Sequence, residues 1–128
     1  SSVVHEALPE VVGALMHPDK EVRDSAARTL GKIAEAVPPG LLSERRRIEM
    51  HDALIRALGD PQPAVRAKAV RSLGKLAACG HLDETRRRDL RSRLQALLER
   101  GEETDWDHAF IVRRQVKEAL AHLGDIES

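Results

Sequence analysis

The sequence predicts an all-α protein, built as a right-handed α-solenoid in which three helical hairpins stack into an array of six antiparallel helices. The main observation is an internal repeat: residues 15–34 recur 43 residues later as residues 58–77, with ten of the twenty paired positions identical. A weaker third copy follows 47 residues after the second. Recurrence at a period in the forties is typical of stacked helical hairpins, each of which buries its apolar face against its neighbours.

The composition predicts the same fold class. The 128 residues include one tryptophan, one phenylalanine and no tyrosine, so the core must be built from leucine, valine, isoleucine and alanine. Such a core suits closely packed helices and suits sheets poorly. We expect a single domain over residues 1–128. Because the helical pattern begins almost at Ser1, we also expect the sequence to be a piece of a longer protein.

Start and stop signals place the six helices. Side chains that cap helix N-termini stand at Asp19, Ser43 and Asp83, and glycines that end helices stand at Gly80, Gly101 and Gly124. The expected helices span residues 3–16, 20–37, 43–58, 64–79, 84–100 and 108–123. Short connections imply antiparallel neighbours, which gives repeats at residues 3–37, 43–80 and 83–124.

Glycine recurs inside the second helix of the first two repeats, at Gly31 and Gly74, and Ala121 takes this position in the third. Glycine in a helix interior costs about 1 kcal/mol relative to alanine. A small residue kept at one register indicates either that another backbone comes close or that a groove is kept clear. We favour close helix packing.

The repeated pattern is leucine, aspartate and proline, then Val-Arg, then alanine, then Leu-Gly-x-Leu. It is carried best by Leu58, Asp60, Pro61, Val65, Arg66, Ala69, Leu73, Gly74 and Leu76. The first copy carries it nearly as well, and the third keeps Asp107, Val112, Arg113, Leu120 and Leu123. This pattern resembles the second half of a HEAT repeat of the bacterial HEAT-like variety, and the resemblance covers almost the whole chain.

The resemblance implies a ladder between repeats, in which the aspartate before the second helix meets the arginine after the valine. In this sequence these positions are Asp60 with Arg66 and Asp107 with Arg113.

The first and third repeats depart from the pattern. His17 replaces the first aspartate, so Arg23 is expected to pair with Asp19 or with a carboxylate of the next repeat. The third repeat carries an insertion within residues 99–106. We expect Trp106 and Phe110 to fold back and plug the open end of the array, with an exposed contact site in the insertion as the alternative.

The resemblance also implies that the second helices line a concave surface, the usual binding face of such arrays. At about 100° per residue, one stripe on these helices points away from the apolar positions. We call this stripe the second-helix face; it comprises Asp24, Arg28, Glu35, Ala67, Arg71, Ala78, Arg114, Glu118 and Asp125. We predict that a partner binds there, and the alternative is an ordinary solvated face with internal ion pairs.

Arginine outnumbers lysine sixteen to five, and two arginine triplets lie near the start of the first helix of the second and third repeats. Stacking would bring them side by side on an edge that we call the arginine edge, made of Arg45, Arg46, Arg47, Arg86, Arg87 and Arg88. Guanidinium groups suit phosphate, so this edge could hold a nucleic-acid backbone or another anionic surface. Interleaved acids and a formal net charge of zero favour solvated, self-paired helix starts instead.

No catalytic constellation stands out, because the lone Cys79 has only His81 nearby in the sequence. We therefore expect a non-catalytic scaffold or adaptor, without cofactor or metal, that holds another protein on the second-helix face. Nucleic-acid or anionic-surface binding through the arginine edge is the alternative. We expect no membrane partner, because no apolar run approaches the ~20 residues that cross a bilayer, and we predict no small-molecule substrate. The single cysteine favours a reducing compartment, the cytoplasm.

Overall fold

The computed structural model describes residues 2–101 and 106–124, with side chains described for residues 6–99 and 110–124. Within these ranges there is no strand, and the helices are α1 Ser2–Ala14, α2 Lys20–Ala36, α3 Glu44–Ala57, α4 Pro63–Ala78, α5 Glu84–Gly101 and α6 Trp106–His122. A short 3-10 helix, η1 Pro39–Leu41, precedes α3. The expected helix bounds agree with the observed ones to within two residues at each end.

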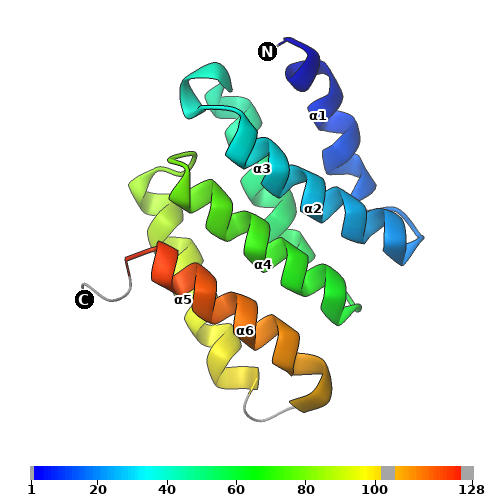
Figure 1. The fold of residues 1–128 in the computed structure, drawn as a ribbon, viewed down its shortest axis with the longest axis vertical. Helices are drawn as coiled ribbons and strands as arrows, with labels where there is room; N and C mark the ends of the chain where they lie inside the picture. Colours follow the sequence, from blue (N-terminus) through cyan, green and yellow to red (C-terminus); the bar gives the residue numbers. More distant parts are fainter. Residues whose placement is uncertain (1, 102–105, 125–128) are drawn as a thin grey trace.

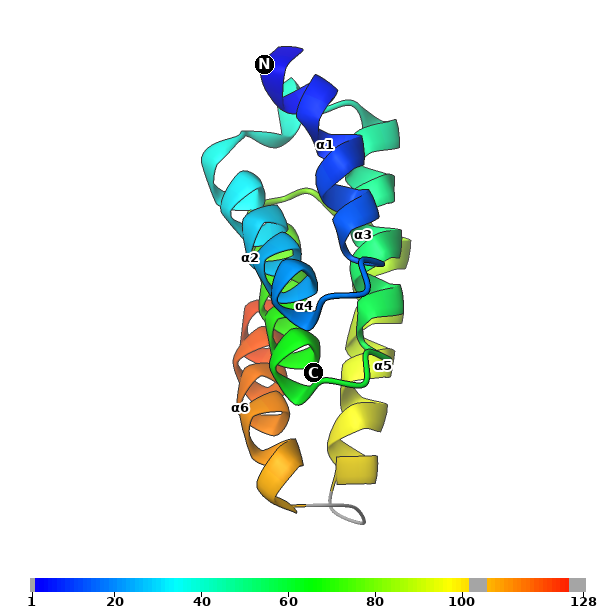
Figure 2. The same cartoon turned by 90° about the vertical axis from the view of Figure 1, so that its right-hand side faces the viewer.

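The helices pair as three antiparallel hairpins that stack in two layers (Figures 1 and 2). One layer holds α2, α4 and α6, and the other holds α1, α3 and α5. Contacts between successive hairpins are concentrated in the first layer, where α4 packs closely on both α2 and α6. Contacts between α1 and α3 are sparser. The layer of second helices is therefore the more tightly packed side of an all-α helical-repeat solenoid.

A continuous aliphatic core runs through the three hairpins. Leu30, Leu54, Leu73, Leu94 and Val116 are all 0% exposed and belong to one buried cluster. Burying a side chain of this kind contributes about 1.5–3 kcal/mol relative to leaving it exposed. The core therefore follows from the recurring leucine and valine positions, as predicted.

Small residues let the second helices approach one another. A Cβ added at Gly31 would lie 2.5 Å from Ser72 Oγ, and one added at Gly74 would lie 3.1 Å from Ala119 Cβ. The Ser72 hydroxyl also donates to the main-chain oxygen of Ala27, 2.5 Å away on α2. Close helix packing, and not a cleared groove, explains both glycines.

The predicted caps form. The carboxylate of Asp19 accepts from Glu21 N at 2.8 Å, and that of Asp83 accepts from Arg86 N at 2.8 Å. This main-chain hydrogen bond from Arg86 is the largest of the effects that lower the pKa of Asp83. Gly80 ends α4 with a φ of +81°, a left-handed conformation that favours glycine.

Side chains from further along the sequence complete the C-terminal ends of α2 and α4: His81, in the connection after α4, and Arg87 of α5. The Ala34 main-chain oxygen has no intrahelical donor, because Pro38 has no N–H. His81 Nε2 lies 2.9 Å from this oxygen and donates to it. At the equivalent position of the next repeat, Arg87 Nη1 donates to the Ala77 oxygen at 2.9 Å. These bonds connect successive hairpins where the second helices end.

Candidate functional site

An ion pair connects the first two repeats near the starts of their second helices. Arg23 Nε lies 2.7 Å from Asp60 Oδ2, and Arg23 Nη2 donates to Asp60 Oδ1 at 3.2 Å. The Arg23 side chain is 13% exposed and that of Asp60 is 6% exposed. The hydrogen bond to Asp60 is the largest effect that raises the pKa of Arg23. Of the two partners expected for Arg23, the carboxylate of the next repeat is therefore the one it finds.

The expected pairing of Asp60 with Arg66 is wrong in its geometry. Arg66 Nη1 donates instead to the main-chain oxygens of Asp60 and Pro61, at 2.8 and 3.2 Å. Arg23 contacts the turn before its own helix in the same way. The reason is that the arginine curls back to the turn carbonyls, while the Asp60 carboxylate points to the preceding repeat.

In the third repeat the arginine of the ladder, Arg113, contacts the main chain of α5. Arg113 Nη1 donates to the main-chain oxygen of Leu98 at 2.8 Å. The side chain of Asp107 lies outside the described residues, so its pairing with Arg113 stays a prediction.

On the second-helix face the acids of α2 are bound to lysines of α4. Asp24 lies 3.1 Å from Lys68 Nζ, and Glu35 lies 3.0 Å from Lys75 Nζ. Each pair joins one repeat to the next, and the four side chains are between 24% and 54% exposed. Exposed pairs of this kind contribute little to stability, about 0–1 kcal/mol each. They do, however, neutralise the two lysines and the two acids.

Two arginines on the same face have no acidic partner in the part of the chain that the structure describes. Arg28 of α2 and Arg71 of α4 occupy the same register in the first two repeats, and both are exposed. Neither forms an ion pair with any side chain in the described ranges. The face therefore offers two positive groups on neighbouring helices, with neutralised pairs on either side of them.

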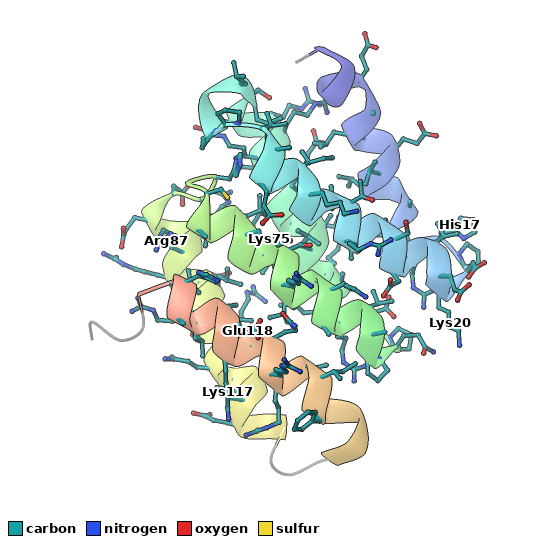
Figure 3. The ribbon with its side chains drawn as sticks, in the orientation of Figure 1. His17, Lys20, Lys75, Arg87, Lys117 and Glu118 are labelled. Carbon is teal, nitrogen blue, oxygen red and sulfur yellow. The ribbon has the colours of Figure 1, made fainter. Side chains whose placement is uncertain are left out.

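In the third repeat the charge at the register of Arg28 and Arg71 is reversed. Glu118 of α6 stands at the register of Arg28 and Arg71, and Arg114 stands one turn earlier, 3.9 Å from Glu118. Figure 3 shows Lys75 on α4 and Glu118 on α6, on the side of the molecule formed by the second helices.

A hollow of about 240 Å³ lies between α4 and α6 on this face. Its charged, amide and imidazole side chains are those of Glu35, Arg71, Lys75, Gln115, Glu118 and His122. The hollow is small and open, so it fits one or two side chains of a partner better than a whole small molecule.

One position of the predicted stripe was wrong. Ala67 was expected on the exposed face with Arg71 and Ala78, yet it is only 8% exposed and belongs to the core cluster. Because α4 packs against both α2 and α6, a wider part of its surface is buried than the single apolar stripe of a helix with one neighbour. Asp125 lies outside the described residues.

Most guanidinium groups of the arginine edge are already bonded. Acids lie close to four of them: Arg45 and Arg46 approach Glu49 at 3.6 and 2.8 Å, Arg86 approaches Asp83 at 2.8 Å, and Arg88 approaches Glu84 at 3.4 Å. Arg87 donates to a main-chain oxygen of α4, and Arg47 is half-buried with its Nε buried and unpartnered. This agrees with self-paired helix starts. Figure 3 places Arg87 at the edge opposite His17 and Lys20.

The expectation that Phe110 plugs the end of the array is wrong, because its side chain is 60% exposed. Val112 and Val116 of the same helix point into the core, which leaves Phe110 off the buried stripe. The side chain of Trp106 and residues 102–105 of the insertion lie outside the described residues.

Two buried histidines were missed in the sequence. His51 and His81 are 4% and 3% exposed. His51 Nδ1 lies 3.0 Å from Asp52 Oδ1, and His81 completes the end of α2. Only Pro38, four residues after a helical alanine, could have indicated that a donor was needed there.

The described residues contain no group of three His, Cys, Asp or Glu side chains placed to hold a metal ion. None of the described helices combines the length and the apolar character that crossing a membrane requires.

Three stacked hairpins around one aliphatic core define a class, the helical-repeat proteins known as α-solenoids. The family model of the HEAT repeat matches residues 7–37 and 52–80, in the first and second hairpins. The chain belongs to the HEAT-repeat family. HEAT repeats generally mediate contacts between proteins. Comparison with curated proteins and with solved structures finds no match.

Proposed function

We propose that this protein is a non-catalytic scaffold that holds a protein partner on its second-helix face, through Arg28 and Arg71. The observation that carries the proposal is the charge arrangement on α2 and α4. Lys68 and Lys75 are neutralised by acids of the neighbouring helix, whereas the two arginines have no acid among the described residues. Exposed guanidinium groups fixed on a rigid face are suited to capture carboxylates through forked hydrogen bonds.

The geometry indicates what such a partner presents. Neighbouring packed helices lie about 8–10 Å apart, so Arg28 and Arg71, at one register of α2 and α4, are separated by about that distance. Two acidic side chains with a similar separation fit them, three residues apart in a polyproline II segment, which has three residues per turn and rises about 3.1 Å per residue. Glu118 stands at the same register on α6, the helix next to α4. It favours a basic side chain after the two acids.

The arginine edge supports the alternative, binding to an anionic backbone, less well. Its guanidinium groups are mostly shared with acids or with main-chain oxygens, so few are free to release counterions from a nucleic acid. A cytoplasmic location belongs to the same proposal, supported by the single cysteine, which cannot form a disulfide within the chain.

The test is capture of partner proteins by the immobilised chain, with two double variants that carry the same change of charge. Arg28→Glu with Arg71→Glu reverses the two cations of the second-helix face. Arg45→Glu with Arg88→Glu reverses two cations of the arginine edge, whose side chains are 87% and 77% exposed. We expect the first variant to lose capture and the second to retain it, while both keep the helical circular dichroism and the melting temperature of the parent.

The opposite pattern would assign binding to the arginine edge. Capture that falls by about 10³-fold or more between 50 and 200 mM salt, and that disappears after nuclease treatment, would indicate a nucleic acid as the ligand. Equal capture by the parent and by the Arg28→Glu, Arg71→Glu variant would reject the second-helix face.

A further inference from the structure

The side of the second repeat that faces the first has a defined chemistry. Lys68, Ser72 and Lys75 of α4 each bond to α2, the lysines to carboxylates and the serine to a main-chain oxygen. Val65 and Ala69 are 1% and 0% exposed. These five residues show what a repeat presents to the hairpin stacked before it.

The first repeat presents nearly the same set one period earlier. The equivalents 43 residues before are Val22, Ser25, Ala26, Thr29 and Lys32. The first four line an open hollow of about 470 Å³, together with Glu10, Val11 and Ala14 of α1 and Glu21 of α2. Within the described residues no helix covers this hollow, and Lys32 is exposed and has no ion pair. The first repeat thus keeps the residues of an interface between repeats, and none of the described helices packs on them.

The opposite end of the array differs. The residues through which α2 and α4 meet the next hairpin include Ala27 and Val70, both 0% exposed. The residue at this register in α6 is Lys117, which is exposed, and Arg114 beside it is 70% exposed (Figure 3). Stacking a further hairpin on α6 in the same way would bury an unpaired lysine, which is strongly unfavourable. The two ends of the array are therefore chemically unlike.

We propose that the N-terminal end face, formed by Val22, Ala26, Thr29 and Lys32 of α2 with Val11 of α1, is a docking surface for a further helical hairpin of the HEAT kind. This surface is distinct from the second-helix face, and the inference does not depend on the proposed function.

The contacts inside the array specify the occupant. Its second helix presents small residues at the registers of Ala27 and Gly31, because those positions allow α4 to approach α2. It presents a carboxylate to Lys32, as Glu35 does to Lys75. It also offers a main-chain oxygen to the Thr29 hydroxyl, which now bonds within its own helix to Ser25 O at 2.8 Å. One contact inside the array, the ion pair of Arg23 with Asp60, would not be repeated at this surface, because His17 stands where the second repeat has Asp60.

The probe is a copy of residues 1–43 fused directly before Ser1, which preserves the 43-residue period of the first two repeats. Docking is measured by thiol labelling of Thr29→Cys in the original repeat, in a Cys79→Ala background. At the equivalent position Ser72 is 2% exposed. We expect labelling to slow by about tenfold or more in the fusion, as for a site that reacts only after local opening. Lys117→Cys, at the other end, should label at the same rate with and without the added copy.

Two further variants decide the cause. Ala27→Lys in the added copy imitates Lys117 and should restore fast labelling of Thr29→Cys. In the fusion, His17→Asp in the original repeat gives the added copy's Arg23 a carboxylate to pair with. The substitution should therefore raise the melting temperature of the fusion more than it raises the melting temperature of the parent. Equal labelling of Thr29→Cys in the parent and the fusion would overturn the proposal. So would a dimer of the parent chain that Lys32→Glu dissociates, because a second copy would then be the occupant.

Discussion

At the scale of single residues, Asp60 shows how one side chain joins two repeats. Its carboxylate accepts from Arg23 of the preceding repeat and, at 2.9 Å, from the main-chain N of Gln62 at the start of α4. Its main-chain oxygen accepts from Arg66. The sequence predicted the residues of this ladder but not which groups meet, because the direction of a side chain depends on the neighbouring repeat.

Asp83 provides a prediction at this scale. Its pKa is lowered chiefly by the main-chain hydrogen bond from Arg86. A lowered pKa in the folded state means that the carboxylate contributes stability above its ordinary pKa, about 3.9, and loses it as the pH falls through the lowered value. Asp83→Asn keeps a capping oxygen but removes the charge. We expect a lower melting temperature at pH 7, and a difference from the parent that shrinks below about pH 4.

Thermal unfolding followed by circular dichroism between pH 7 and pH 3 checks this expectation. Asp83→Ala, which removes the cap as well as the charge, serves as the control and should be less stable than Asp83→Asn throughout. A constant difference between the parent and Asp83→Asn down to pH 3 would contradict the assignment.

At the scale of elements, the second helices are closer together than the first helices because small residues face one another across them. The recurrence of Gly31 and Gly74 indicated this contact in the sequence. What each glycine meets, Ser72 in one case and Ala119 in the other, is set by the offset between neighbouring helices. That offset is a property of packing and is not encoded in either helix alone.

Glycine-to-alanine substitutions separate helix propensity from packing. Gly13 has no atom within 4 Å of an added Cβ, so Gly13→Ala should raise the free energy of unfolding by up to about 1 kcal/mol. Gly31→Ala gains the same propensity but places a Cβ against Ser72, and overpacking of this kind costs about 1–3 kcal/mol. We therefore expect a net loss of stability in Gly31→Ala, measured by urea unfolding.

Ser72→Gly removes the atoms that the new methyl group would meet. The double variant Gly31→Ala, Ser72→Gly should be more stable than the sum of the two single changes predicts. Strict additivity, or a Gly31→Ala variant as stable as Gly13→Ala, would show that the helices do not meet at Gly31.

At the scale of the whole molecule, α4 is the central element. It packs on α2 and α6 within its layer and also contacts α3 and α5. Nine of its sixteen residues are buried, which leaves little of the helix for solvent. The stability of the stack should therefore depend more on α4 than on any helix at either end.

Native-state hydrogen exchange tests this ranking. The amides of α4 should exchange most slowly, and those of α1 and α5 faster, because opening follows the number of packed neighbours. Leu73→Ala should lower the free energy of unfolding by about 2–5 kcal/mol, since Leu73 is 0% exposed. Slower exchange in α1 than in α4 would be incompatible with a stack held at its centre.

The sequence by itself determined the six helices, their caps and the aliphatic core. These depend on local periodicity and on residues such as Asp19, Asp83 and Gly80, whose roles involve only nearby backbone. The tertiary structure alone decided that Asp60 pairs with Arg23, that Ala67 is buried, that Phe110 is exposed, and that Arg28 and Arg71 have no acidic partner within the described ranges. The physical reason is that pairing and exposure depend on which side chains neighbouring repeats bring together, and that depends on the offset and closeness of helices far apart in the sequence.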